Sequence, residues 1–405
     1  MDSKELTRNA DFKSEIFTGD EYCSNPVIQS FVSIGSNITL TFNTDGIQPF
    51  RSSPKSLWPI LCTINELPYD FVDKFILLSS LWHCESNPGS DSFMKPFINE
   101  MRHLYESGVE WHDKHGNRQV TKVLALICIC DSPARCVLCE MTQFNDEFGC
   151  TFCLHPTETA RKEFAKGDVR VYPFISPIPP TRTHATTLTA ANASTENDRI
   201  DGLKGLSRLF LLPQFDIIEG MVPDSMHAAW LGVSKQFITL FLESTGKPFY
   251  MGSQADIAAM DNTLLGVQPI NEMLRTPRSL KFRSLFKATE YRNVSLFYSV
   301  MLFKDRLPLP NLKHWLLFVN AMRLLFKKKI KPSHIELARA LIVNFIIGVQ
   351  DVYGSAHVSY NVHLLFHMVD YVKMWGAPWR SSAFLFEHVG GVMAKRFYGS
   401  THINK

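Results

Sequence analysis

Two carboxylates in this sequence stand where a predicted strand ends, a position at which an acid can be held against a ligand. The alternation of apolar and polar residues over 38–43 predicts a strand with one buried face, and it stops just before Asp45. The nearly continuous apolar run Lys122–Cys130 predicts a strand buried on both faces, and Asp131 follows it directly. Both acids also have a simpler interpretation, because Asp-Gly is a common turn pair and Asp before Ser-Pro is a helix-start signal.

A second group of side chains has the spacing of metal ligands. Cys150 and Cys153 form a C-x-x-C pair in a glycine-containing turn, the arrangement with which metal knuckles present two thiolates. His363 and His367 are four residues apart in a predicted helix, so both imidazoles share one face and can reach one ion. A histidine pair on an apolar helix is, taken alone, more often part of the core or the surface.

Two further pairs are open to more than one interpretation. Cys136 and Cys139, a C-x-x-C pair fourteen residues upstream of the first, could complete a four-cysteine zinc site. Asp224 and His227 place a carboxylate and an imidazole one turn apart at the start of a predicted helix, which also fits a capping acid with a buried histidine. Basic clusters at 281–292 and 327–331 are weak evidence for DNA contact, because charge runs usually face solvent.

The composition is that of an ordinary globular protein. The chain has 405 residues, enough for two or three domains, with 45% hydrophobic and 20% charged residues. Its net charge of +3 permits a nucleic-acid partner without indicating one. The polar start shows no signal peptide, and no apolar run is long enough to span a bilayer. We therefore expect a soluble intracellular protein whose nine cysteines are thiols and metal ligands.

The order of predicted elements indicates an α/β core followed by a helical block. Beyond the two strands above, we expect a strand over Leu57–Ile64, helices over Tyr69–Cys84 and Ser92–Ser107, and a loop-like stretch over 157–201. The remaining predicted helices are Met226–Glu243, Asp256–Leu265, Lys287–Phe303, Leu312–Phe326, Pro332–Tyr353, Tyr360–Trp375 and Ser381–Phe397, the last carrying Glu387. A strand-rich front followed by helices favours an α/β core with a helical insertion or partner domain.

Seven segments of the chain carry a resemblance to a known family. They are TFNTDGIQPFRSSPKSLWPI, ICICDSPAR, FNDEFGCTFCLHP, FDIIEGMVPDSMHAAWLGV, KATEYRNVSLFYS, YGSAHVSYNVHLLFH and SAFLFEHVGG. In this order they resemble transposases of the CACTA/EnSpm type, notably their animal relatives, from about Asn37 to the end. The wider DDE group includes the Transib elements and the V(D)J recombinase. The sequence departs from the family at PDSMH and at FND, neither of which touches the acids.

The resemblance implies a fold and a set of site residues. The fold is an RNase H-like mixed-sheet core interrupted by a large all-helical insertion domain, with a zinc-binding knuckle. Asp45, Asp131 and Glu387 would be the catalytic acids that bind Mg²⁺ or Mn²⁺, with Asp131 rather than Asp224 as the second acid. The family order of zinc ligands favours a structural Zn²⁺ site whose members are Cys150, Cys153, His363 and His367, with Cys136 and Cys139 as rival ligands.

The same resemblance suggests how the chain is divided and what it does. We expect a lead-in at 1–36, the first part of the core at 37–154, a loop-rich connection at 155–222, the helical insertion at 223–375 and a C-terminal core helix at 376–405. The expected activity is metal-dependent DNA strand cleavage and strand transfer in the nucleus, by a homo-oligomer on DNA with no membrane contact. Alternatives are a domesticated or degenerate DNA-binding protein without catalysis and a zinc-stabilised interaction scaffold. Since only 36 residues precede the first strand, we also expect DNA binding to be weak and unspecific.

Overall fold

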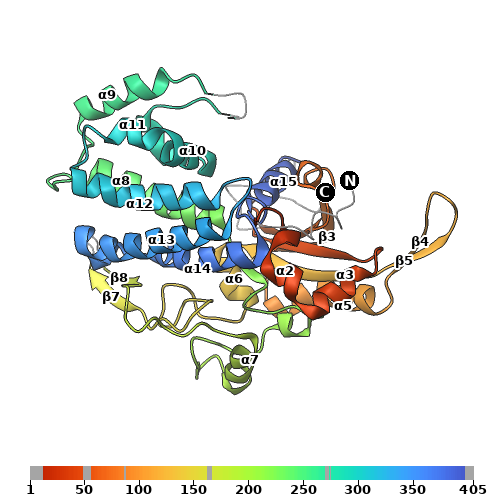
Figure 1. Ribbon diagram of the computed structural model, residues 1–405. Coiled ribbons are helices and arrows are strands. Elements are labelled where there is room, and N and C mark those ends of the chain that lie inside the picture. Colours follow the sequence, from red (N-terminus) through yellow and green to blue (C-terminus); the bar gives the residue numbers. More distant parts are fainter. Residues whose placement is uncertain are drawn as a thin grey trace.

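The fold is centred on a five-stranded mixed sheet (Figure 1). The computed structural model describes residues 12–48, 56–85, 88–161, 167–269, 273 and 275–396. The strands of this sheet, in spatial order, are β3 (Leu77–Cys84), β2 (Ser56–Ile64), β1 (Ile38–Thr44), β6 (Val123–Cys130) and β9 (Met221–Pro223). The β3–β2 and β2–β1 pairs are antiparallel, whereas β1–β6 and β6–β9 are parallel. The predicted mixed α/β class is confirmed.

Helices cover both faces of the sheet. All eight residues of β6 are buried, as expected of a central strand between two layers. On one face, apolar residues of helix α5 (Ser90–Glu106) pack on Phe42 and Ile60; the Phe42 and Phe97 ring centroids are 5.0 Å apart. On the other face, Ile127 and Ile129 belong to the core of the helical block. The strands expected at 38–43, Leu57–Ile64 and Lys122–Cys130 are all present.

One predicted helix is wrong. The segment Tyr69–Cys84 forms only a short helix, α4 (Tyr69–Val72), and then the edge strand β3. The apolar residues of this segment lie at spacings that suit a helix as well as a strand, and a short apolar run does not distinguish the two. The pairing with β2, in which Trp82 lies opposite Trp58, decides in favour of the strand. Helix α5 and the short helix α6 (Ser132–Leu138) after Asp131 agree with the sequence.

The predicted helical block is present with small changes at its boundaries. Two of its helices contain π-helical stretches, η3 (Met226–Ser234) before α8 and η5 (Val294–Tyr298) between α10 and α11. The α-helices are α8 (Lys235–Glu243), α9 (Gln254–Leu265), α10 (Ala288–Asn293), α11 (Ser299–Phe303), α12 (Leu309–Leu325), α13 (Pro332–Tyr353), α14 (Tyr360–Trp375) and α15 (Phe384–Ala394), with 3₁₀ turns η4 (Leu280–Leu285) and η6 (Ser355–His357). Helix α14 packs on η3, α13 and strand β9, which joins the block to the sheet.

The structure also contains smaller elements that the sequence analysis did not predict. The lead-in contains η1 (Ile16–Thr18), α2 (Asp20–Ser24) and α3 (Pro26–Ser33), and its residues 1–11 are outside the described part of the chain, as are 49–50 and 397–405. A hairpin of β4 (Val109–His112) and β5 (Arg118–Thr121) projects from the body (Figure 1). The loop-rich connection predicted at 155–222 also holds hairpin β7 (Glu158–Arg161) and β8 (Asp168–Val171), helix α7 (His184–Ala193) and turn η2 (Arg208–Leu211). The domain boundaries given above remain predictions.

Within the described residues, no helix combines the length and apolar character needed to cross a bilayer.

Candidate functional site

The parallel pairing of β1 and β6 brings the first two acids to one edge of the sheet. Asn43 of β1 lies opposite Ile129 of β6, and its side-chain amide donates a hydrogen bond to the Ile129 carbonyl at 2.7 Å. Asp45 and Asp131 each lie two residues beyond this pair. Because parallel strands end at the same edge of a sheet, both carboxylates leave the sheet side by side.

Helix α15 adds the third acid to the same edge. Glu387 lies in the first turn of this helix, and a cavity of about 270 Å³ is lined by Asp45, Asp131, Glu387 and His227 together. The other residues that line it are Asn43, Gly46, Ile47, Gln48, Pro59, Leu61, Ala383, Phe386, Gly390 and Gly391. We call this cavity the acid pocket. The structure thus collects the three predicted acids, whose sequence positions span more than 340 residues, in one place.

Two of the acids also make the local hydrogen bonds expected of their turns. Oδ1 of Asp45 accepts a hydrogen bond from the backbone N–H of Gly46 at 2.7 Å. Oδ1 of Asp131 accepts one from the backbone N–H of Ala134 at 2.8 Å, so Asp131 is the N-cap of α6. These bonds use only one of the two oxygens of each carboxylate. The capping role and a role in the pocket are therefore compatible.

The charges in the acid pocket influence one another. Burial, followed by the neighbouring carboxylates of Asp131 and Glu387, raises the pKa of Asp45 to about 7. The backbone hydrogen bond from Gly46 and the charge of His227 oppose this increase only partly. The pocket therefore carries negative charge that its own residues do not fully compensate. A positively charged ligand would relieve that repulsion.

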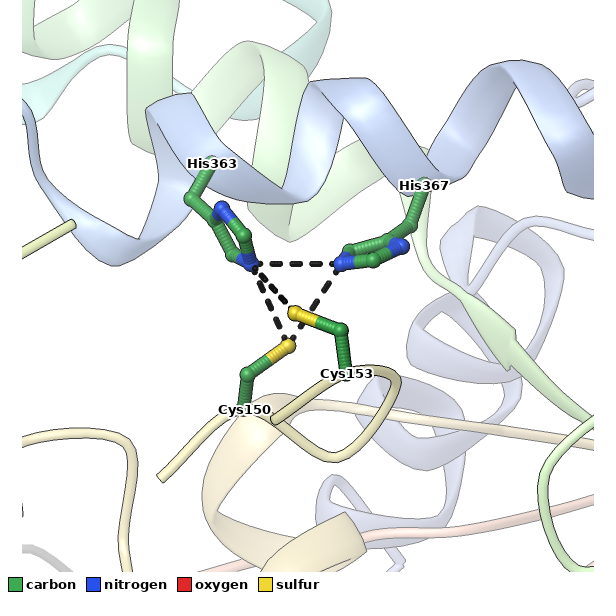
Figure 2. Close-up of side chains that lie close together, drawn as sticks. All are labelled: Cys150, Cys153, His363 and His367. Carbon is green, nitrogen blue, oxygen red and sulfur yellow. Dashed lines mark hydrogen bonds between the residues drawn. The ribbon is translucent and has the colours of Figure 1, made fainter. Parts of the chain in front are cut away.

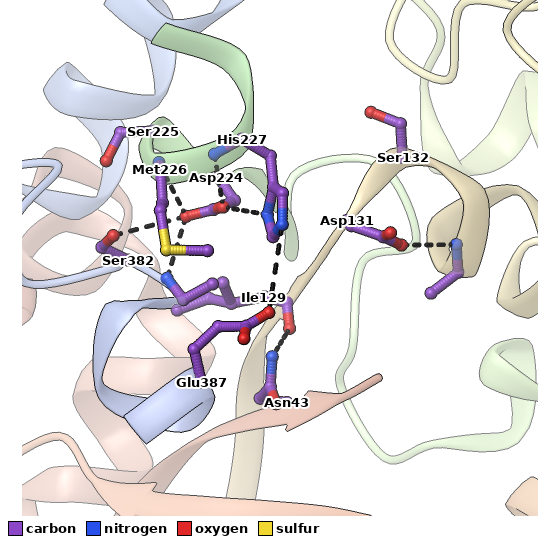
Figure 3. Close-up of polar contacts among 12 residues, drawn as sticks. Asn43, Ile129, Asp131, Ser132, Asp224, Ser225, Met226, His227, Ser382 and Glu387 are labelled. Carbon is purple, nitrogen blue, oxygen red and sulfur yellow. Dashed lines mark hydrogen bonds and ion pairs between the residues drawn. The ribbon is translucent and has the colours of Figure 1, made fainter. Parts of the chain in front are cut away.

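His227 is a member of the acid pocket that the sequence alone left open. Its Nδ1 is 2.7 Å from Oδ2 of Asp224, and its Nε2 is 4.0 Å from Oε1 of Glu387, toward which the ring points (Figure 3). Burial lowers the pKa of His227, but the hydrogen bond and charge of Asp224, together with Asp131 and Glu387, outweigh burial and raise the pKa to about 9. His227 therefore places a positive charge beside Glu387 at neutral pH.

Asp224 supports His227 from outside the pocket. Its side chain is buried, and its oxygens accept hydrogen bonds from the backbone N–H groups of Met226, His227 and Ala383. The bond from Ala383, at 2.8 Å, ties the start of the η3 segment to the residue before α15. Asp224 thus holds the imidazole and the helix of Glu387 in one arrangement. Among the residues that line the pocket, Asp131 is present and Asp224 is not.

The acids of the pocket fit a divalent cation in ligand type. Carboxylate oxygens are the ligands that Mg²⁺ and Mn²⁺ prefer, and the uncompensated charge described above favours a cation. The carboxylates of the acid pocket lie further apart than the ligands of a single bound ion. Among the described residues, the only group of three or more candidate ligand atoms all within 4.8 Å of one another is a different one, made of two cysteines and two histidines.

This second group has the geometry of a zinc site (Figure 2). Sγ of Cys150 is 3.3 Å from Nε2 of His363 and 3.6 Å from Nε2 of His367, and Sγ of Cys153 is 3.4 Å from Nε2 of His363. The two imidazole nitrogens are 3.2 Å apart. Zinc bonds of about 2.3 Å to sulfur and 2.1 Å to nitrogen give tetrahedron edges of about 3.6 Å for S–N and 3.4 Å for N–N. All four side chains are buried, and they fit a closed structural site.

The surrounding residues hold the cysteine turn in place. The backbone N–H of Phe152 donates to Sγ of Cys150 at 3.4 Å, and the Arg182 guanidinium donates to the carbonyl of Cys150 at 2.9 Å. Gly149 is required at this turn, because a Cβ there would lie 2.5 Å from the carbonyl oxygen of Gln143. On the histidine side, the Tyr172 ring stacks on His363 with centroids 4.9 Å apart. The site therefore has a supporting shell as well as four ligands.

The rival ligands do not join this cluster. Cys136 lies in α6 and Cys139 is its C-cap residue, both are buried, and burial raises the pKa of both thiols. Within the described residues, neither belongs to a group of three or more ligand atoms with metal-site spacing. Of the two completions that the sequence left open, the structure assembles the one with the histidine pair.

The site thus combines an acid pocket at a sheet edge with a buried Cys₂His₂ cluster, on a mixed α/β fold. Residues 24–172 match the transposase family tnp2, which supports a transposase-related protein. This segment includes Asp45, Asp131, Cys150 and Cys153, whereas His227, both zinc-site histidines and Glu387 lie beyond it. No curated protein matches the chain.

Proposed function

We propose that this chain is a DDE-type DNA transposase core of the CACTA/EnSpm type, which cleaves DNA strands and transfers them. The observation that carries this proposal is the convergence of Asp45, Asp131 and Glu387 on one pocket. Two of these acids lie within the segment similar to the tnp2 transposases, and the third comes from a helix more than two hundred residues later. An acid cluster of this kind suits metal-dependent phosphodiester chemistry.

The topology supports an RNase H-like core. The strands lie in the order β3-β2-β1-β6-β9. Strand β2 is antiparallel to both of its neighbours, whereas β1, β6 and β9 are parallel to one another. This arrangement is the one expected of an RNase H-like core. The helical block between β9 and α15 is inserted between the second and third acids, as the resemblance to Transib and the V(D)J recombinase implies. We accordingly propose the domain division given above.

The chain's own residues have separate tasks in this proposal. Asp45, Asp131 and Glu387 would hold Mg²⁺ or Mn²⁺, which when bound supplies charge neutralisation for an in-line displacement at phosphorus. His227, positively charged and next to Glu387, would bind a phosphate oxygen of the substrate, and Asp224 would orient it. Cys150 and Cys153, with His363 and His367, would hold a structural Zn²⁺ that joins the core to the helical block.

The test is cleavage of DNA by the purified chain. We expect Mn²⁺- or Mg²⁺-dependent nicking of a supercoiled plasmid, abolished separately by Asp45→Asn, Asp131→Asn and Glu387→Gln. The matched control is Asp113→Asn at the exposed tip of the β4–β5 hairpin, which should leave nicking unchanged. Folding of each variant is checked by circular dichroism. Equal activity in all variants, or no metal-dependent nicking by the unmodified chain, would refute the proposal.

The partners follow from the chemistry. The substrate would be DNA, which implies a nuclear location, and joining two DNA ends implies more than one copy of the chain on DNA. Apart from His227, the acid pocket repels phosphates unless a metal cation is bound, because its carboxylates carry the same sign of charge. DNA binding should therefore depend on the basic surfaces of the chain and on the metal.

A further inference from the structure

One charged side chain between the acid pocket and the Cys₂His₂ cluster has no charged partner. Arg135 lies in α6 and is 1% exposed. Its Nη2 donates a hydrogen bond to Oγ of Ser132 at 3.4 Å, whereas Nε and Nη1 have no hydrogen-bond partner among the described residues. No carboxylate in the described part of the chain forms an ion pair with it. Because a buried charge without a counter-charge costs stability that an apolar side chain of similar length would not, stability alone does not explain this arginine.

The guanidinium is held instead by an aromatic ring in the cysteine turn. Its central carbon lies 4.7 Å from the ring centroid of Phe152, a cation–π contact that is strengthened by the absence of water. Phe152 is buried between Cys150 and Cys153 in the chain, and its ring also packs against the imidazole of His367, with centroids 5.3 Å apart. The ring therefore touches both the cysteine side and the histidine side of the zinc site, and it passes their position on to Arg135.

Helix α6 connects this contact to the second acid. Asp131 is the N-cap of α6, and its backbone carbonyl accepts a hydrogen bond from the N–H of Arg135 at 3.0 Å. The hydrogen bond from the guanidinium to Ser132, the residue after Asp131, ties the same turn a second time. The position of Asp131 is therefore fixed relative to that of Arg135.

The guanidinium also bridges the two hydrophobic cores that lie on opposite faces of the sheet. Leu138 of α6 packs in the core on the α5 face, whereas Phe152 packs in the core of the helical block. The acid pocket spans the same division. Asp131 belongs to the turn that opens α6, whereas Glu387 follows Phe386, a member of the core of the helical block. A contact that joins the two cores at this point sets the separation of these two acids.

We propose that Arg135 is a positioning residue for Asp131 and couples zinc in the Cys₂His₂ cluster to cation binding in the acid pocket. This inference rests on the proposed function, because it requires both sites to bind their metals. When zinc fixes the cysteine turn to α14, the ring of Phe152 holds the guanidinium, and α6 presents Asp131 at the distance from Glu387 that a shared cation requires. Without zinc the turn is loose and α6 loses this restraint. The acid pocket should then bind a cation more weakly.

The experiment measures Mn²⁺ binding to the zinc-loaded chain without DNA, so it does not depend on strand cleavage. Arg135→Met removes the charge but keeps the length of the side chain, and it should weaken Mn²⁺ binding about tenfold, which corresponds to about 1.4 kcal/mol. Arg135→Lys keeps a positive charge over the ring and should restore binding to within about threefold of the unmodified chain. The matched control is Cys136→Ala, a buried substitution on the same helix, which should leave the Mn²⁺ affinity unchanged.

A second set of variants tests the same contact from the zinc side. Phe152→Leu removes the ring and should weaken Mn²⁺ binding as Arg135→Met does. Combining the two should cause no further loss, because both remove one contact. The zinc-free variant His363→Ala with His367→Ala should show the same weakening. Circular dichroism and elemental analysis follow folding and zinc content, and Phe152→Leu serves as the test if the arginine variants do not fold.

The outcomes separate this inference from the proposed function. Mn²⁺ binding that is lost in Asp45→Asn but unchanged in Arg135→Met, in Phe152→Leu and in the zinc-free variant overturns the coupling alone. Equal weakening by Arg135→Met and Arg135→Lys would also overturn it, because the charge over the ring would then have no role. An unmodified chain that binds no Mn²⁺, or that binds it equally well after Asp45→Asn, overturns the proposed function as well.

Discussion

Replacing His363 and His367 together by alanine should remove zinc from the chain and loosen the contact between the cysteine turn and helix α14. The cluster joins residues 210 to 217 positions apart. A cross-link that closes a loop of this length removes about 18 cal/mol/K of chain entropy from the unfolded state, or about 5 kcal/mol at 25 °C.

That free energy translates into a measurable change of melting temperature. At about 2.1 cal/mol/K per residue, a chain of 405 residues has an unfolding entropy near 0.85 kcal/mol/K, so a loss of 5 kcal/mol lowers Tm by roughly 6 °C. We expect one zinc per chain in the unmodified protein and none in the double variant, measured by elemental analysis. Calorimetry should show the decrease in Tm, and a chelator added to the unmodified chain should reproduce it.

The matched control replaces Cys136 and Cys139 by alanine. These thiols are equally buried but lie outside the cluster, so the control variant should keep its zinc even if its core is somewhat destabilised. Loss of zinc in the control, with full zinc in the histidine variant, would refute the Cys₂His₂ assignment and favour the four-cysteine site. Full zinc in both variants would place the metal elsewhere.

Three further outcomes follow from the structure. Asp224→Asn should lower the pKa of His227 from about 9 toward 6.5, because the charge and hydrogen bond of Asp224 outweigh the effect of burial on this pKa. NMR titration of His227 measures the pKa, and an unchanged pKa in the variant would contradict this explanation. Burial, then Asp216 and Glu21, raises the pKa of Glu219 to about 7 in the folded state. Between about pH 4.5 and pH 7, the native chain thus binds more protons at Glu219 than the unfolded chain, so the free energy of unfolding should fall as the pH rises through this range. Glu219→Gln should reduce that loss by about 1–2 kcal/mol, a value that allows for screening because Glu219 is only partly buried. Equal pH profiles of Tm for the variant and the unmodified chain would contradict this. With a net charge of only +3, DNA binding should weaken steeply with salt and be similar on a transposon-end duplex and a scrambled one, whereas a preference of about a thousandfold or more would show that this chain reads sequence.

Local patterns in the sequence determined most of the elements. The alternation before Asp45 and the unbroken apolar run before Asp131 predicted β1 and β6, since each pattern records the faces that a strand buries. The apolar spacing of the helical block predicted the course of α8 to α14 in the same way. The Ser-Pro after Asp131 predicted the start of α6, because proline suits the first turn of a helix.

Contacts between distant segments decided what the sequence left open. The strand β3 was predicted as a helix, since a short apolar run fits both periods and only its pairing with β2 selects one. The choice between Cys136 and the histidine pair depended on contacts across more than two hundred residues, which spacing along the chain does not encode. His227 joins the acid pocket because Asp224 binds both its ring and the residue before α15. The sequence by itself determined the longer helices, three strands of the sheet and the candidate side chains. The tertiary structure decided the edge strand β3 and which side chains meet, because both depend on how separate elements pack.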